Sequence, residues 1–253
     1  MDPGTSAADE VLAATLAGLP SSEHGYLVAA SDAVPARFDR IGDAGWLASQ
    51  IQLQARRWPS VDRRVRATLW WYSVSQVFLT PTVASLFVTG EPLSARPGEV
   101  LLNRFEDGTI LSARSLAVLR GDPVAAAAGA LREGFAFAIP LLARAGAARE
   151  LPLWAIATDS LANRLLWLGR ATGDVAGAIT LSTALARLIG SPLPTPRYVE
   201  VARRAPRTGQ AWFVRRSSCC LIYFEPGVAK CASCPRLAPA KRTALLKSAA
   251  DGN

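Results

Sequence analysis

Apolar positions along most of the chain recur every three or four residues, which is the spacing of an amphipathic helix. In residues 44–57, for example, Trp46, Leu47, Ile51 and Leu53 follow this spacing closely. The pattern predicts helices over 7–19, 44–57, 62–81, 123–140, 152–170 and 174–189. Pro81 and Pro140 are expected to end or bend the helices that contain them, because proline removes a backbone hydrogen bond.

Extended segments are fewer and shorter than the helices. Residues 100–105 and 109–115 flank Glu106-Asp107-Gly108, a turn sequence that predicts a β-hairpin. Further strands are expected at 198–201, 211–214 and 221–224, all of which follow the proline-rich stretch SPLPTP at 191–196. The predicted fold class is α+β, with a predominantly helical body in 1–195 and a compact segment in 196–253 that holds every cysteine.

Charge is distributed unevenly along the chain. Residues 1–196 carry 17 basic and 17 acidic side chains, whereas residues 197–253 carry 11 basic and 3 acidic ones and so supply the whole net charge of +8. Half of the chain is hydrophobic, which indicates a globular protein. A basic segment suggests nucleic acid or a membrane surface, but no groove-binding helix or stacking platform stands out, so no nucleic-acid partner is expected.

No targeting segment is apparent in the sequence. The N-terminus, MDPGTSAADE, is acidic where a signal peptide would be basic. The longest uncharged stretch, 67–90, is diluted by Ser, Thr, Gln and Pro, so a buried helix is favoured over a membrane span. We therefore expect a cytoplasmic protein with reduced cysteines, and peripheral contact with the inner face of the membrane stays an alternative.

The four cysteines are spaced C-C-x10-C-x2-C, from Cys219-Cys220 to Cys231 and Cys234. Four clustered thiolates suit zinc, an iron–sulfur cluster or a redox thiol centre. A four-cysteine zinc site usually has two C-x2-4-C pairs, whereas one half here is an adjacent pair. Adjacent side chains tend to diverge, and two irons offer separate attachment points, so the spacing favours a binuclear cluster while leaving zinc open.

The stretch RRSSCCLIYFEPGVAKCASCP at 215–235 resembles the C-terminal signature of the FhuF-like ferric siderophore reductases. In that family the four cysteines hold a [2Fe-2S] cluster, so the resemblance implies that Cys219, Cys220, Cys231 and Cys234 are the iron ligands. The likeness is strong in this stretch and weaker over 70–90 and 154–170, where it concerns the type and order of segments. The first sixty residues carry little of it.

The resemblance implies an oxidoreductase that reduces siderophore-bound Fe(III) to Fe(II). It implies no catalytic residue other than the cysteines that bind the cluster. Fe(II) is held less tightly by the chelator, so reduction releases the metal. The chain has no G-x-G pair and no Walker A loop, so electrons are expected from a separate ferredoxin or flavoprotein. The single histidine, His24, is expected to be structural. Siderophore synthetases are related to the family's non-cluster part, but no nucleotide motif supports ligase activity here.

Basic residues near the cysteines could contact an anionic siderophore or an acidic electron donor, or could offset the cluster charge. These candidates are Arg203, Arg204, Arg207, Arg215, Arg216 and Lys230. On the 154–170 helix, Asp159, Asn163 and Arg164 are expected to form a polar surface face, and a position facing a substrate cleft is the alternative. Two alternatives stay open: an electron-transfer protein that uses the same cluster for another acceptor, and a zinc-stabilised interaction module.

Overall fold

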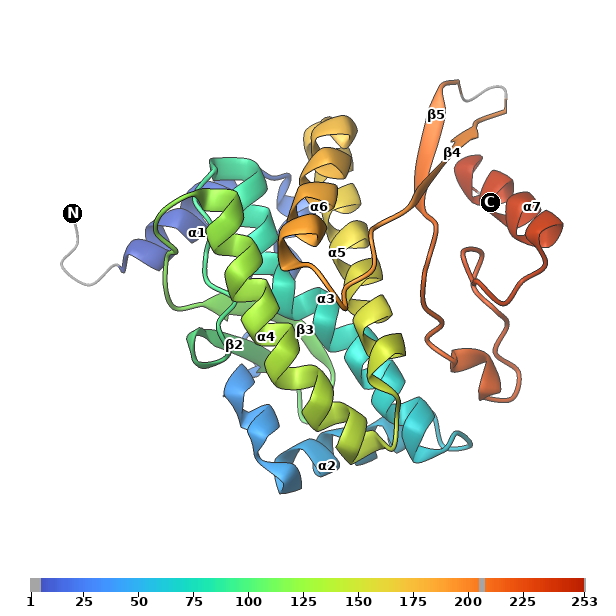
Figure 1. The fold of residues 1–253 in the computed structure, drawn as a ribbon, viewed down its shortest axis with the longest axis horizontal. Helices are drawn as coiled ribbons and strands as arrows, with labels where there is room; N and C mark the ends of the chain where they lie inside the picture. The colour runs from blue at the N-terminus through green and yellow to red at the C-terminus, as the bar shows by residue number, and fades with distance from the viewer. Residues whose placement is uncertain (1–5, 205–207, 253) are drawn as a thin grey trace.

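A computed structural model describes residues 6–204 and 208–252 of the chain. Figure 1 shows a body of packed helices with a small sheet, and beside it a C-terminal hairpin and helix. The α-helices are α1 Ala7–Ala17, α2 Ala44–Leu53, α3 Arg63–Thr89, α4 Pro123–Gly146, α5 Glu150–Thr172, α6 Val175–Ile189 and α7 Pro239–Ala250. The strands are β1 Val34–Arg37, β2 Val100–Arg104, β3 Ile110–Ser115, β4 Tyr198–Ala202 and β5 Gln210–Val214. The predicted α+β class is confirmed.

Helix α3 is the central element of the body, because α1, α2, α4, α5 and strand β3 all pack against it. It begins after Asp62, whose carboxylate accepts a hydrogen bond from the Val65 N–H. Pro81 was expected to end or bend this helix; it does not end it, since the helix continues to Thr89. A proline inside a helix costs about 3 kcal/mol, and burial of large side chains such as Trp71 outweighs that cost.

Helices α4, α5 and α6 complete the bundle around α3. Asp122 caps α4 through the Ala125 N–H, and Pro140 lies within the helix without ending it. Glycine lets α4 approach α3 closely, since a Cβ built at Gly134 would lie 2.2 Å from the Phe78 ring. The break between α5 and α6 falls at Gly173, as predicted, where a positive φ of 82° suits glycine.

The predicted 100–115 hairpin is confirmed as β2 and β3, which pair antiparallel. Strand β1 was not predicted; it adds to the free edge of β2, so that the sheet order is β1-β2-β3. Gly108 occupies the hairpin turn with a φ of 85°. Alternating positions of this sheet, such as Leu102 and Ala113, are buried in the core of the body.

Membrane insertion is suggested by length and composition for one helix of the described residues, α4, whose best window has a mean hydropathy of 1.3. This helix packs against the other helices of the bundle. The core helices of soluble proteins can be equally long and apolar, so these two properties are weak evidence for a membrane span. The uncharged stretch at 67–90 lies in α3 and is buried as predicted. The structure is therefore compatible with a soluble protein.

The C-terminal unit consists of the antiparallel hairpin β4-β5, the cysteine segment and helix α7. Leu246 and Ala250 of α7 pack against Val201 and Ala211 of the hairpin in a small core of their own. The Tyr198 hydroxyl lies 2.5 Å from Ser182 Oγ of α6, which ties the hairpin to the body. The change of structure falls near residue 196, and the division into two domains at that point stays a prediction.

Two expectations for this unit need correction. Residues 221–224 do not form a strand: Leu221 has a left-handed backbone with φ 65°, and a 3-10 helix, Ile222–Phe224, follows it. Helix α7 was not predicted at all, because its sequence is polar on average and only a few apolar positions mark a buried face.

Candidate metal centre

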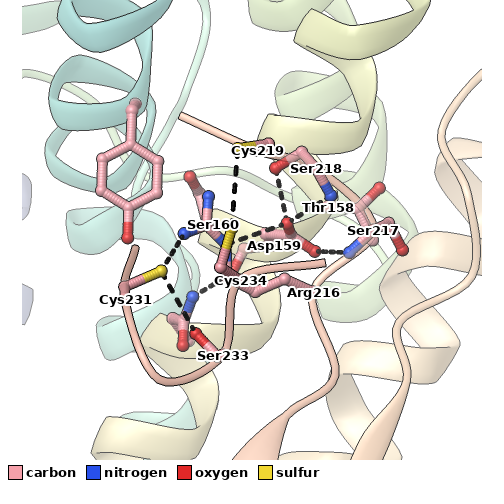
Figure 2. Close-up of polar contacts among 12 residues, drawn as sticks. Thr158, Asp159, Ser160, Arg216, Ser217, Ser218, Cys219, Cys231, Ser233 and Cys234 are labelled. Atoms are coloured by element: carbon pink, nitrogen blue, oxygen red, sulfur yellow. Dashed lines mark hydrogen bonds and ion pairs between the residues drawn. The ribbon is translucent and has the colours of Figure 1, made fainter. Parts of the chain in front are cut away.

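The cysteine segment lies against helices α3 and α5 of the body. Figure 2 shows it beside Thr158, Asp159 and Ser160 of α5. The left-handed backbone at Leu221 and the short 3-10 helix after it reverse the chain, which brings the second cysteine pair back toward the first. The second pair forms a tight turn, in which the Cys234 N–H donates to the Cys231 carbonyl at 2.9 Å.

The four cysteines are free thiols, and Cys220 and Cys234 are buried while Cys219 and Cys231 are partly exposed. Cys219 Sγ and Cys234 Sγ lie 3.8 Å apart. Two thiolates on one tetrahedral metal stand about 3.8 Å apart when each metal–sulfur bond is about 2.3 Å. Within the described residues no three Cys, His, Asp or Glu side chains converge as they would on one ion. The separation of Cys219 Sγ and Cys234 Sγ therefore suits two thiolates on one metal ion.

Asp159 anchors the residues that immediately precede the first cysteine. Its carboxylate, buried on α5, accepts hydrogen bonds from the Ser217 N–H at 2.8 Å and the Ser218 N–H at 2.9 Å. It also accepts one from the Ser218 hydroxyl at 2.5 Å, and it pairs with Arg216 Nε at 3.5 Å (Figure 2). One side chain of the helical body thus fixes the backbone on which Cys219 and Cys220 stand.

Arg216 brings a buried positive charge to the sulfur atoms. Its Nη1 lies 3.4 Å from Cys231 Sγ, and its guanidinium carbon lies 4.7 Å from the centre of the Tyr72 ring. Burial lowers the pKa of Arg216, but the neighbouring Tyr72, Cys220, Asp159 and Cys231 together raise it above the usual value, so the side chain stays cationic.

The second terminal nitrogen of Arg216, Nη2, is buried and has no hydrogen-bond partner among residues 6–204 and 208–252. A buried donor left unpaired costs about 1–3 kcal/mol, which a bound acceptor would recover. A [2Fe-2S] cluster with four thiolate ligands is an anion with acceptor sulfurs. The four thiols and the spare donor therefore fit this group.

The pKa of the Cys219 thiol argues against a redox thiol centre. Burial, together with the neighbouring Cys234, raises this pKa to about 11. Reactive cysteines have a lowered pKa, because the thiolate is the nucleophile. A metal, in contrast, supplies the positive charge that such a thiol needs in order to lose its proton.

The predicted basic contacts separate into two groups. Arg203, Arg204, Arg215 and Lys230 are exposed, although Arg204 also pairs with Asp251 at 3.8 Å. Arg216 is buried against Asp159 and Cys231, so among the predicted alternatives its position suits an offset of the cluster charge rather than contact with a donor protein at the surface. Arg207 lies outside the described residues. His24 contacts the Leu16 and Leu19 carbonyls, as expected of a structural histidine.

Sequence reasoning missed the role of Asp159. The expectation that it belongs to a polar surface face with Asn163 and Arg164 is wrong, since Asp159 and Arg164 are buried. The helical spacing contained a signal for this burial. Asp159 follows Ile156 by three residues and precedes Leu166 by seven, so the three side chains share one face of the helix, and both apolar residues are buried. An acidic residue on such a face needs a buried partner, and the basic cysteine segment provides it.

Residues 216–236 match the family described as FhuF 2Fe-2S C-terminal domain. This segment is similar to the FhuF-type iron–sulfur domain. Its cysteines at 219, 220, 231 and 234 fit the motif, and its cofactor is a [2Fe-2S] cluster. No curated protein matches the chain. The match suggests an iron–sulfur protein with a redox role and agrees with the resemblance seen in the sequence.

Proposed function

We propose that the chain is a ferric siderophore reductase of the cytoplasm, which converts chelator-bound Fe(III) to Fe(II) and so releases the iron. The FhuF 2Fe-2S domain, with its four cysteines beside a buried arginine, is the observation that carries the proposal. The cluster supplies electrons one at a time, as this reduction requires. Hydroxamate and catecholate oxygens hold Fe(II) less tightly than Fe(III), so the chelator survives the release.

Each role in the site follows from a contact of the chain. Cys219, Cys220, Cys231 and Cys234 hold the two irons. Cys219 and Cys234, whose sulfur atoms lie 3.8 Å apart, would be close enough to bind the same iron. Asp159 fixes the backbone before the first cysteine, and Arg216 stabilises negative charge at Cys231.

A separate one-electron carrier, a ferredoxin or a flavoprotein, delivers the electrons in this proposal. The sequence contains no dinucleotide fingerprint through which the chain could take hydride from a nicotinamide. Exposed basic residues of the cysteine segment, including Arg215 and Lys230, support an acidic partner.

The decisive experiment is anaerobic purification followed by iron, sulfide and zinc analysis and a visible spectrum. About two irons and two sulfides per chain, with colour that bleaches on reduction, are expected. The reduced protein is then mixed with ferric siderophores, and Fe(II) is trapped by a coloured ferrous chelator. Reoxidation of the protein together with Fe(II) formation in a one-to-one ratio supports the reductase.

Two results would replace this function with another. A loaded protein that reduces no ferric chelate is an electron-transfer protein for a different acceptor. A colourless chain with stoichiometric zinc and no sulfide is a zinc-stabilised interaction module.

A further inference from the structure

A groove of about 700 Å³ lies between the cysteine segment and the helical body. One wall is formed by the cysteine segment and includes Ser218, Cys219 and Leu221. The opposite wall is formed by the start of α3 and by the junction between α4 and α5. Small-molecule sites are commonly about 300–1,000 Å³, so the groove has the size of a ligand site.

Positive charge predominates in this groove. Arg64, Arg149 and Arg236 line it, and Glu150 is the single acidic residue among the lining side chains. All three arginines are exposed, and Arg64 forms a solvent-exposed ion pair with Asp62 at 3.9 Å, in which about half of the Arg64 side chain stays accessible to a ligand. The first turn of α5 lies in the same groove, and its N-cap residue makes no side-chain cap, so its backbone N–H groups add partial positive charge.

Apolar surface accompanies this charge. Leu151 is 70% exposed at the start of α5, which is unusual for a leucine, and Pro152 and Pro235 lie in the same groove. A ligand with a charged centre and an apolar periphery is complementary to such a lining. Cys219 is the one cysteine among the lining residues, so a ligand here would contact a side chain of the iron–sulfur domain.

We propose that this groove binds the ferric chelate, and that Arg64 and Arg149 select chelates of net negative charge over neutral ones. The naming of the substrate rests on the proposed reductase function, whereas the position and the charge preference rest on the groove itself. An acidic donor protein is the competing occupant. A compact chelate is favoured over a protein because arginines from both walls and Cys219 line the same groove, which has the volume of a small-molecule site.

The test measures binding without electron transfer. The cluster-loaded, oxidised protein is dialysed to equilibrium against gallium(III) chelates, which are redox-inert analogues of the ferric ones, and bound gallium is quantified. One chelate is a tricatecholate of net charge −3 and the other is a neutral trihydroxamate. The test variant is Arg64→Gln with Arg149→Gln, which leaves every cysteine and its neighbours unchanged. The matched control is Arg120→Gln, at the other end of α4 and about 35 Å away along that helix of 24 residues.

We expect the double variant to bind the anionic chelate about tenfold more weakly, because two charges close to the ligand are lost. Its affinity for the neutral chelate should change less than twofold, and Arg120→Gln should bind both chelates as the wild type does. Unchanged affinity of the double variant for the anionic chelate, or no binding of it by the wild type, overturns the proposal. Slower reduction of the cluster by an acidic ferredoxin, with unchanged gallium binding, also overturns it and assigns the groove to the donor.

Failure of this inference is distinguishable from failure of the reductase function. A wild-type protein that reduces ferric chelates, but whose gallium binding ignores Arg64 and Arg149, refutes the site and keeps the function. A protein that binds the anionic gallium chelate through these arginines, but reduces no ferric chelate, supports the site and refutes the function.

Discussion

Asp159 and Arg216 form an ion pair whose side chains are 2% and 3% exposed. Removing one member of such a pair leaves a charge buried without its partner, which is more costly than losing a surface pair. The Asp159 carboxylate also accepts the Ser217 and Ser218 N–H groups, so its loss would release the backbone before the first cysteine. Both residues therefore contribute to stability, and Arg216 in addition places positive charge beside Cys231.

Replacing Asp159 with Asn is expected to lower the free energy of unfolding by about 3–5 kcal/mol, since Arg216 loses its buried counter-charge. The measurement is anaerobic urea unfolding followed by circular dichroism. Glu133→Gln is the matched control, because it breaks an exposed pair with Arg96 and should cost less than about 1 kcal/mol. Equal costs for the two variants would contradict the anchoring role.

Replacing Arg216 with Gln is expected to lower the reduction potential of the cluster. Reduction adds negative charge, which the Arg216 donor near Cys231 stabilises. For a one-electron couple, a shift of about 60 mV in reduction potential corresponds to a tenfold change in the equilibrium constant for reduction. Spectroelectrochemical titration measures it, with Arg216→Lys as a variant that keeps the charge and should shift less. Arg215→Gln removes an exposed charge and serves as the control. A potential that moves equally in the Arg215 and Arg216 variants would refute a specific effect.

At the scale of elements, strand β4 is joined to helix α6 by the hydrogen bond between partly buried Tyr198 and buried Ser182. Burial raises the pKa of Tyr198 to about 12, whereas the hydrogen bond with Ser182 lowers it. The unfolded phenol titrates near 10. A phenol whose pKa is higher in the folded state contributes its full stability below pH 10 and loses it as the pH rises through 12.

The variant Tyr198→Phe isolates this contribution. The free energy of unfolding of the wild type minus that of the variant should fall by roughly 2–3 kcal/mol between pH 9 and pH 12. Urea unfolding at several pH values measures the difference, and the other tyrosines cancel because both proteins contain them. A difference that does not depend on pH would show that Tyr198 ionises in the fold as it does in the unfolded chain.

The elements that the sequence predicted well are those with strong local signals. Asp62 and Asp122 mark helix starts, and Gly108 and Gly173 mark turns, all at the predicted places. Strand β1 depends on pairing with a strand more than sixty residues away, which no local pattern reveals. Pro81 was misjudged because tertiary burial outweighs its local cost.

The candidate site shows the same division between local and long-range information. The spacing of the cysteines indicated the iron–sulfur domain, because a ligand motif is contained in a short stretch of sequence. The partnership of Asp159 with Ser217 and Ser218 joins residues almost sixty positions apart. The groove beside Cys219 is likewise assembled from distant segments, so it could be found only in the folded chain.

At the scale of the whole molecule, the excess of positive charge lies in residues 197–253, next to the candidate cluster site. Several of these side chains are exposed and lie outside the groove, for example Arg203, Arg215, Lys230 and Lys241. Such a distribution attracts a negatively charged donor before the two proteins touch, and dissolved salt screens this attraction. Charge at this scale therefore affects the rate of encounter rather than the chemistry.

Reduction of the cluster by an acidic ferredoxin should slow by about tenfold or more between 20 and 500 mM salt, since the Debye length falls from roughly 20 Å to about 4 Å. Stopped-flow measurement of the bimolecular rate constant tests this expectation. Dithionite provides no suitable control, because it is itself an anion; a photoreduced neutral flavin does, and its rate should hardly change with salt. Substituting Arg215 and Lys230 with Gln should lower the ferredoxin rate at low salt and flatten its salt dependence. A ferredoxin rate that is independent of salt would mean that electrons arrive without electrostatic steering, and that the basic segment instead balances the charge of the cluster.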